Sequence, residues 1–192
     1  GSDDWEILAM WFELVELQRK AGDEDAARRS LNQVADVIRT IRIDPAAVKK
    51  AIEKNAKSGV ESFDYLGASL SPFFLAEFYF KIGEERRLLG DQDGAIADES
   101  RALAVMDGYD GPMMARIVDD QSKWAGPGAL KAWFYGHAAE VRFKRGDKAG
   151  ARELVERARQ IALGEATEGE RELAMTGVVE GLAKVGDPDG AL

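Results

Sequence analysis

The pattern Gly-Asp-x-x-x-Ala occurs four times in this chain and constrains its fold more than any other feature of the sequence. Glycine readily adopts the left-handed conformation that ends a helix. An aspartate directly after it caps the next helix, because its carboxylate accepts backbone N–H groups at the positive end of the helix dipole. The pattern therefore predicts helical hairpins with two-residue turns, at Gly22–Ala27, Gly90–Ala95, Gly146–Ala151 and Gly186–Ala191.

The residues on either side of each Gly-Asp pair also recur at fixed distances. Eleven residues before the glycine the chain has a large residue, which is Trp11, Tyr79, Tyr135 or Met175. Leu14, Ile82 and Val178 lie three residues further on, and spacings of three and four place such residues on one face of a helix. Leu31 and Val155, four residues after the alanine, continue the buried stripe of a second helix. Each turn is thus expected to join two amphipathic helices.

This arrangement resembles the tetratricopeptide repeat, a helix-turn-helix unit of about 34 residues. The segment that matches best carries the family's residues at Tyr79, Ile82, Gly83, Gly90, Ala95 and Ala102. The chain departs from the family pattern in lacking its late proline and in having Glu99 where an aromatic residue belongs. Arg86 and Arg142 also replace a tyrosine of the pattern. The resemblance implies an all-α fold, a right-handed α-solenoid of stacked repeats.

We expect one repeat array over residues 1-192, interrupted at two places. The first interval between turn glycines is 68 residues, twice the repeat length, which leaves room for a degenerate unit starting at Asp44-Pro45. The next interval holds an insertion with a short helix expected from Pro112, between Gly-Pro pairs. The chain stops before the fourth hairpin can form its second helix, so we expect either a truncated chain or an array completed by another chain. The expected segments are hairpins at about 4-42, 72-107, 129-163 and 168-192, a degenerate unit at about 43-70 and a helical insertion at about 108-128.

Composition excludes several classes of function. The net charge of −9 argues against general nucleic-acid binding, which needs a surplus of cations on one face. The lack of cysteine excludes disulfides and thiol chemistry, and no apolar run is long enough to cross a membrane. The one histidine, His137, has no partner set for a zinc site or a catalytic triad. We therefore expect no enzyme activity, no metal and no cofactor; the compartment is left open, with the cytoplasm favoured.

A ladder of glutamates emerges when the four segments are aligned on the turn glycine. Six residues before the glycine stand Glu16, Glu84, Glu140 and Glu180. Three of them precede a lysine by four residues, a helix pair worth about 0.3–0.5 kcal/mol, and Glu84 has Arg87 three residues later. One interpretation is a set of surface ion pairs that satisfy each other. The alternative comes from the resemblance, which implies that this face of the first helices lines a concave groove.

The function that the resemblance implies is a protein- or peptide-binding scaffold that uses this groove. Its aromatic residues would anchor the partner, and its glutamates would favour a basic or amide-rich ligand over an acidic C-terminal peptide. Tight binding of such an acidic peptide, abolished by Lys144→Glu, would contradict that expectation. The candidate binding residues are Phe12, Glu16, Arg19, Phe80, Glu84, Arg87, Trp133, Glu140, Phe143, Lys144 and Glu180.

Two other functions stay open at this point. An unfinished fourth hairpin would leave a stripe of Met175, Val178, Val179 and Leu182 uncovered, which would favour a homodimer. An all-α enzyme or small-molecule sensor would instead need a pocket where the insertion at 108-128 closes over the groove. Such a pocket would be lined by Trp124 and Trp133.

Overall fold

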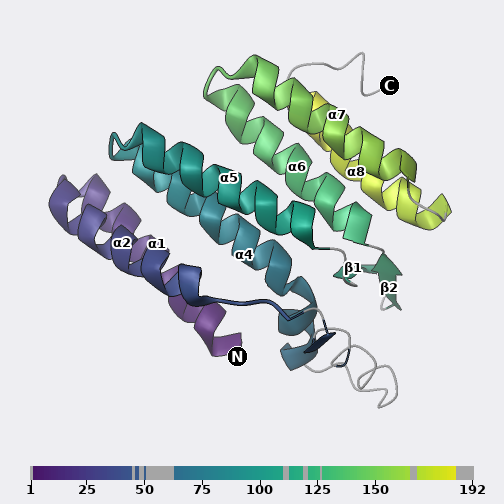
Figure 1. Cartoon of the computed structure of the whole chain (residues 1–192), viewed down its shortest axis with the longest axis horizontal. Helices are drawn as coiled ribbons and strands as arrows, with labels where there is room; N and C mark the ends of the chain where they lie inside the picture. Colours follow the sequence, from purple (N-terminus) through teal and green to yellow (C-terminus); the bar gives the residue numbers. More distant parts are fainter. Residues whose placement is uncertain are drawn as a thin grey trace. The chain divides into compact units, whose positions relative to one another are not determined.

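The chain folds into two compact helical units, residues Gly1–Gly108 and Tyr109–Leu192, which we call unit 1 and unit 2 (Figure 1). Each has its own core of buried apolar side chains. A computed structural model describes the chain at residues 2–44, 46–47, 50, 63–109, 113–118, 121–125, 127–164 and 168–184. Helices predominate in these residues, as the sequence predicts.

Unit 1 contains two antiparallel helical hairpins. The first is formed by α1 (Ser2–Lys20) and α2 (Glu24–Thr40), and the second by α4 (Phe63–Leu88) and α5 (Gln92–Gly108). Helix α4 packs on both helices of the first hairpin. It begins at Phe63 and continues through Pro72, so the helix start expected near 72 is not where this helix begins. Most of the degenerate unit expected at 43-70 lies outside the described residues.

The turns of the hairpins have the geometry that the Gly-Asp pairs predict. Gly22, Gly90 and Gly146 have φ values of 82°, 86° and 87°. At the second turn the Asp91 N–H donates to the Arg86 carbonyl at 2.8 Å and the Gly90 N–H donates to the Arg87 carbonyl at 3.0 Å, which is a Schellman motif. The Asp91 carboxylate then accepts the Gly94 N–H at 2.9 Å and caps α5. The predicted turn is confirmed three times, whereas the fourth, at Gly186, lies outside the described residues.

A small residue, Gly83, brings the two helices of the second hairpin close together. A Cβ atom at Gly83 would lie 3.0 Å from the carbonyl oxygen of Ala95, so α4 and α5 are in backbone contact here. Large side chains fill the space between hairpins, where the Phe12 and Phe78 rings stack with centroids 5.5 Å apart. The core of unit 1 therefore alternates between close helix contacts and stacked rings.

Unit 2 contains a third hairpin and one further helix. Helix α6 (Pro127–Lys144) pairs with α7 (Lys148–Gly164), and α8 (Glu168–Lys184) packs on both. A Cβ atom at Gly181 of α8 would lie 3.0 Å from the Cα atom of Gly136 in α6. The end of the chain after Lys184, where the fourth turn is expected, lies outside the described residues.

The helix predicted from Pro112 in the insertion is wrong. Strands β1 (Met113–Val118) and β2 (Gln121–Ala125) form an antiparallel hairpin there, with Val118 opposite Gln121 and Met113 opposite Ala125. The segment ends on β-branched Ile117 and Val118, which favour strands. A short apolar run has no hydrophobic periodicity by which a strand can be distinguished from a buried helix, so the sequence pattern did not decide between them.

Candidate functional site

The first helices of the three hairpins, α1, α4 and α6, each carry an exposed or half-buried stripe at corresponding positions, and in each unit we call it the first-helix face. Its members stand 13, 9, 6 and 2 residues before the turn glycine, and this spacing places them on one side of a helix. In unit 1 the first-helix face consists of Ala9, Glu13, Glu16, Lys20, Glu77, Lys81, Glu84 and Leu88. In unit 2 it consists of Trp133, His137, Glu140 and Lys144.

The glutamate ladder lies on this face, and each glutamate whose side chain is described forms an ion pair within its own helix. Glu16 pairs with Lys20 at 2.5 Å, and Glu140 pairs with Lys144 at 2.6 Å. Glu84 is 3.9 Å from Arg87. These are the surface pairs of the first interpretation of the sequence. The Glu180 side chain lies outside the described residues.

Lys20 has the largest effect on the pKa of Glu16. The hydrogen bond from Lys20 and the charge of Lys20 lower the pKa of the Glu16 carboxyl, with smaller contributions from Arg19 and Lys81. Lys81 belongs to α4, and its Nζ atom lies 5.1 Å from the centre of the Phe12 ring. The first-helix face of unit 1 is therefore a strip of mixed charge rather than a purely acidic one.

Unit 2 presents an aromatic pair on its own first-helix face. The Trp133 side chain is 42% exposed, and its ring stacks on His137 with centroids 6.2 Å apart and an angle of 12° between the planes. Trp133 is the one aromatic residue among the exposed large apolar side chains in the described part of the chain. Further along α6, Phe143 is half-buried, with Lys148 Nζ 5.8 Å from its ring centre. The exposed indole is the feature of this face that best fits contact with a partner.

Two of the aromatic residues predicted as anchors are part of the core instead. Phe12 is 0% exposed and Phe80 is 4% exposed, so neither offers surface to a partner. The reason is that the first helices are apolar on more than one side, and the next hairpin covers the side that holds Phe12. Arg19 is also engaged within unit 1, because its Nε atom donates to the buried Glu85 carboxylate at 2.8 Å.

The apolar stripe that the sequence predicts to be uncovered on α8 is exposed only in part. Val178 is 1% exposed, Met175 and Leu182 are half-buried, and Val179 is 39% exposed. Helices α6 and α7 cover the Val178 side of α8. Of the two side chains expected to line a pocket under the insertion, that of Trp124 lies outside the described residues.

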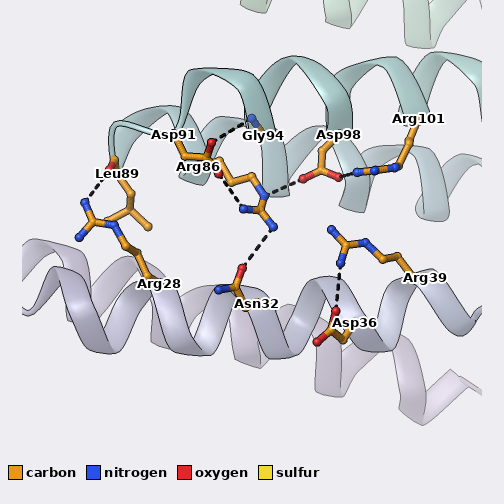
Figure 2. A network of polar contacts seen from close by, with 10 residues as sticks. All are labelled: Arg28, Asn32, Asp36, Arg39, Arg86, Leu89, Asp91, Gly94, Asp98 and Arg101. Atoms are coloured by element: carbon orange, nitrogen blue, oxygen red, sulfur yellow. Dashed lines mark hydrogen bonds and ion pairs between the residues drawn. The ribbon is translucent and has the colours of Figure 1, made fainter.

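A polar network between α2 and the second hairpin was missed by the sequence reasoning (Figure 2). The Arg86 guanidinium donates to Asp98 Oδ2 at 2.8 Å, to Asp91 Oδ2 at 2.7 Å and to Asn32 Oδ1 at 3.2 Å. Asp98 is 1% exposed and also pairs with Arg101. The sequence offered one clue to this network. Asp98 is a charged residue at a position where the second helix of a hairpin is expected to be apolar.

Beside this network a cavity of about 260 Å³ opens, lined by Arg28, Leu31, Asn32, Arg86, Leu89 and Asp91. Its two guanidinium groups are already engaged, because Arg28 donates to the Leu89 carbonyl at 2.7 Å and to Glu24 at 2.9 Å. The cavity therefore belongs to a structural junction and offers no evident chemistry.

Two properties of the described residues concern metal binding and membrane insertion. Within these residues no group of three or more His, Cys, Asp or Glu side chains is placed to hold a metal ion. None of the helices found there combines the length and the apolar character needed to cross a bilayer.

Comparison with protein-family models, with curated proteins and with solved structures returned no match. The likeness to tetratricopeptide repeats therefore depends on the residues quoted above.

Proposed function

We propose that this chain is a protein- or peptide-binding scaffold made of tetratricopeptide-like hairpins stacked as a right-handed α-solenoid. Two features support the proposal. The same Gly-Asp turn joins the helices of three hairpins. In both units the next helix, α4 or α8, packs on the two helices of the hairpin before it, as neighbouring repeats do in a solenoid.

The observation that carries the binding role is the exposed indole of Trp133 on the first-helix face. Tryptophan is enriched among the residues that dominate binding energy at protein interfaces. Its stack on His137 limits the freedom of the ring, which reduces the entropy that a partner must remove on binding. A cationic or amide-bearing side chain can lie over the exposed ring, and cation–π attraction favours the first of these.

The neighbouring charges favour a ligand that is not acidic. Glu140 and Lys144 follow Trp133 on the same face of α6, and the Lys144 Nζ atom is held by Glu140 at 2.6 Å. An incoming carboxylate would have to separate this pair and would then lie close to the Glu140 carboxylate. A lysine or arginine of a ligand would instead meet a carboxylate already placed on the same helix face.

An array of short peptides tests the proposal, half with Lys, Arg and Gln side chains and half with acidic C-terminal tails. We expect the first half to bind, and Trp133→Ala to weaken binding by at least about tenfold, as for a central interface residue. Leu163→Ala is the matched control, because Leu163 is 52% exposed in the same unit but lies on α7. Binding of the acidic half alone, or equal losses in both variants, would count against the proposal, as would an array with no binder.

A further inference from the structure

Helix α1 carries an exposed apolar stripe that is separate from the first-helix face. The side chains of Ile7, Met10, Leu14 and Leu17 are 52%, 68%, 41% and 65% exposed. Their spacing of three, four and three residues is the seven-residue pattern by which one helix packs on another. The opposite side of α1 holds buried residues such as Phe12 and Val15. Helix α1 is therefore apolar on two sides, and only one of them is covered within the described residues.

Alignment on the turn glycines shows what this stripe does in the other helices. Its positions correspond to Leu75, Phe78, Ile82 and Glu85 in α4, which are buried or half-buried. There Phe78 stacks on Phe12 of α1, and Glu85 accepts a hydrogen bond from Arg19 of α1. The stripe is thus the face through which a first helix packs on its neighbouring hairpin.

The same correspondence holds in unit 2. The aligned positions of α8 include Ala174, Val178 and Gly181, all buried. A Cβ atom at Gly181 would meet Gly136 of α6 and the Val155 side chain of α7, both in the hairpin before α8. A packing face that is covered in α4 and in α8 is therefore exposed in α1, and exposed apolar patches of this kind mark interaction surfaces.

We propose that the α1 stripe is a self-association surface through which two copies of this chain pair with their α1 helices antiparallel. A two-fold axis near the middle of the stripe places Ile7 opposite Leu17 of the second copy. The same axis places Met10 opposite Leu14 of the second copy. Every apolar residue of the stripe then faces an apolar residue, which is the self-complementarity that a two-fold interface requires.

The charges of α1 favour the antiparallel arrangement over the parallel one. By sequence, the start of the helix carries Asp3, Asp4 and Glu6 and no cation. Its last turn carries the exposed Lys20, whereas Arg19 is turned to the buried side and binds Glu85. Antiparallel helices bring the acidic start of one copy to the basic end of the other, and parallel helices bring like charges together. The helix dipoles of an antiparallel pair point in opposite directions, which also favours this arrangement.

Disulfide trapping tests the arrangement directly, because the chain has no cysteine of its own. We expect a mixture of the Ile7→Cys and Leu17→Cys variants to form a cross-linked dimer on mild oxidation, and neither variant to do so alone. In the antiparallel pair the two copies of residue 7 are about 15 Å apart along the helix axis, whereas a disulfide needs Cα atoms within about 7 Å. Cross-linking of each variant alone would show parallel pairing and would overturn the proposal.

Sedimentation equilibrium over a range of protein concentrations tests the surface without a cross-link. Each stripe residue is about half exposed and would bury that surface in the dimer, and a symmetric dimer contains each substitution twice. We therefore expect Leu17→Glu to raise the dissociation constant of the dimer by about 30-fold. Ile96→Glu is the matched control, since Ile96 is 62% exposed in α5 of the same unit, and it should leave the dimer unchanged. A wild-type chain that stays monomeric throughout, or equal weakening by the control, would refute self-association. If Leu17→Glu fails to fold, the cross-linking pattern decides the question.

Discussion

Removal of the Asp98 carboxylate should destabilise unit 1 by about 3 kcal/mol. Asp98 is 1% exposed and accepts hydrogen bonds from Arg86 and Arg101, whose side chains are 16% and 46% exposed. Breaking a buried ion pair by removing one partner costs about 3–5 kcal/mol, because a charge is left without compensation. The lower end applies to Asp98→Ala, since Arg86 keeps its bonds to Asp91 and Asn32 and Arg101 reaches solvent.

A double substitution separates this electrostatic effect from simple loss of packing. Asp98 is aligned with Leu154 of unit 2, which is buried with 3% exposure, so the fold accommodates leucine at this position of a second helix. Replacing both members of a buried pair by apolar residues is often neutral or stabilising. We therefore expect Arg86→Met with Asp98→Leu to cost less than Asp98→Ala alone.

Urea unfolding followed by circular dichroism measures these differences, with linear extrapolation to water. Hydrogen exchange at the amides of α4 and α5 assigns the loss to unit 1 if the two units unfold separately. The reasoning is refuted if Asp98→Ala costs less than about 1 kcal/mol, the range of exposed pairs. It is also refuted if the double variant costs as much as the sum of its single substitutions, because the two residues would then be uncoupled.

Two further predictions concern single positions. The Gly94 N–H and then the Arg86 guanidinium lower the pKa of Asp91 below its unfolded value of about 3.9, so its contribution to stability is present above about pH 5 and is lost as the pH falls below about 4. Between about pH 6 and 3 the midpoint of thermal unfolding should therefore fall more in the wild type than in Asp91→Asn, which keeps a capping oxygen; equal falls would contradict this. Gly181→Val should destabilise unit 2 by about 1–3 kcal/mol, because even its Cβ would lie 3.0 Å from the Gly136 backbone. Ala183→Val, at an exposed position of the same helix, is the thermal-unfolding control, and an equal loss there would argue against close packing of α6 on α8.

The parts of the fold that the sequence predicts well are those set by local chemistry. The turns at Gly22, Gly90 and Gly146 need only a left-handed glycine and a capping aspartate, which interact within a few residues. The ion pairs Glu16–Lys20 and Glu140–Lys144 follow in the same way from helical spacing. Such features are predictable because every partner lies within about one turn of helix.

The parts of the fold that the sequence predicts poorly depend on contacts between segments far apart in the chain. Phe12 looks like a groove residue until α4 supplies Phe78 to cover it, and the two are far apart in sequence. Asp98 stands out in the sequence as a charge where unit 2 has Leu154, but its partner is unknown until Arg86 of α4 is seen to face it. The insertion forms strands because β1 pairs with β2. The apolar run of β1 does not by itself reveal this partner.

The two hairpin junctions that the structure describes use different chemistry, and this difference bears on what can cover α1. The junction in unit 1 is apolar at Phe12 and Phe78 but polar at the end of α4, where α1 and α2 present Arg19, Arg28 and Asn32. The junction under α8 is made by small residues, with Gly181 against Gly136. The α1 stripe has Leu17 where α4 has Glu85, so it lacks the carboxylate that Arg19 meets in the junction of unit 1, and its large side chains differ from the small residues under α8. A copy of the α1–α2 hairpin docked there would place its buried-side cations against Leu14 and Leu17 and leave them without partners, at a cost that two aliphatic stripes facing each other do not incur. Self-pairing of α1 thus follows from the chemistry of the junctions as well as from the exposure of the stripe.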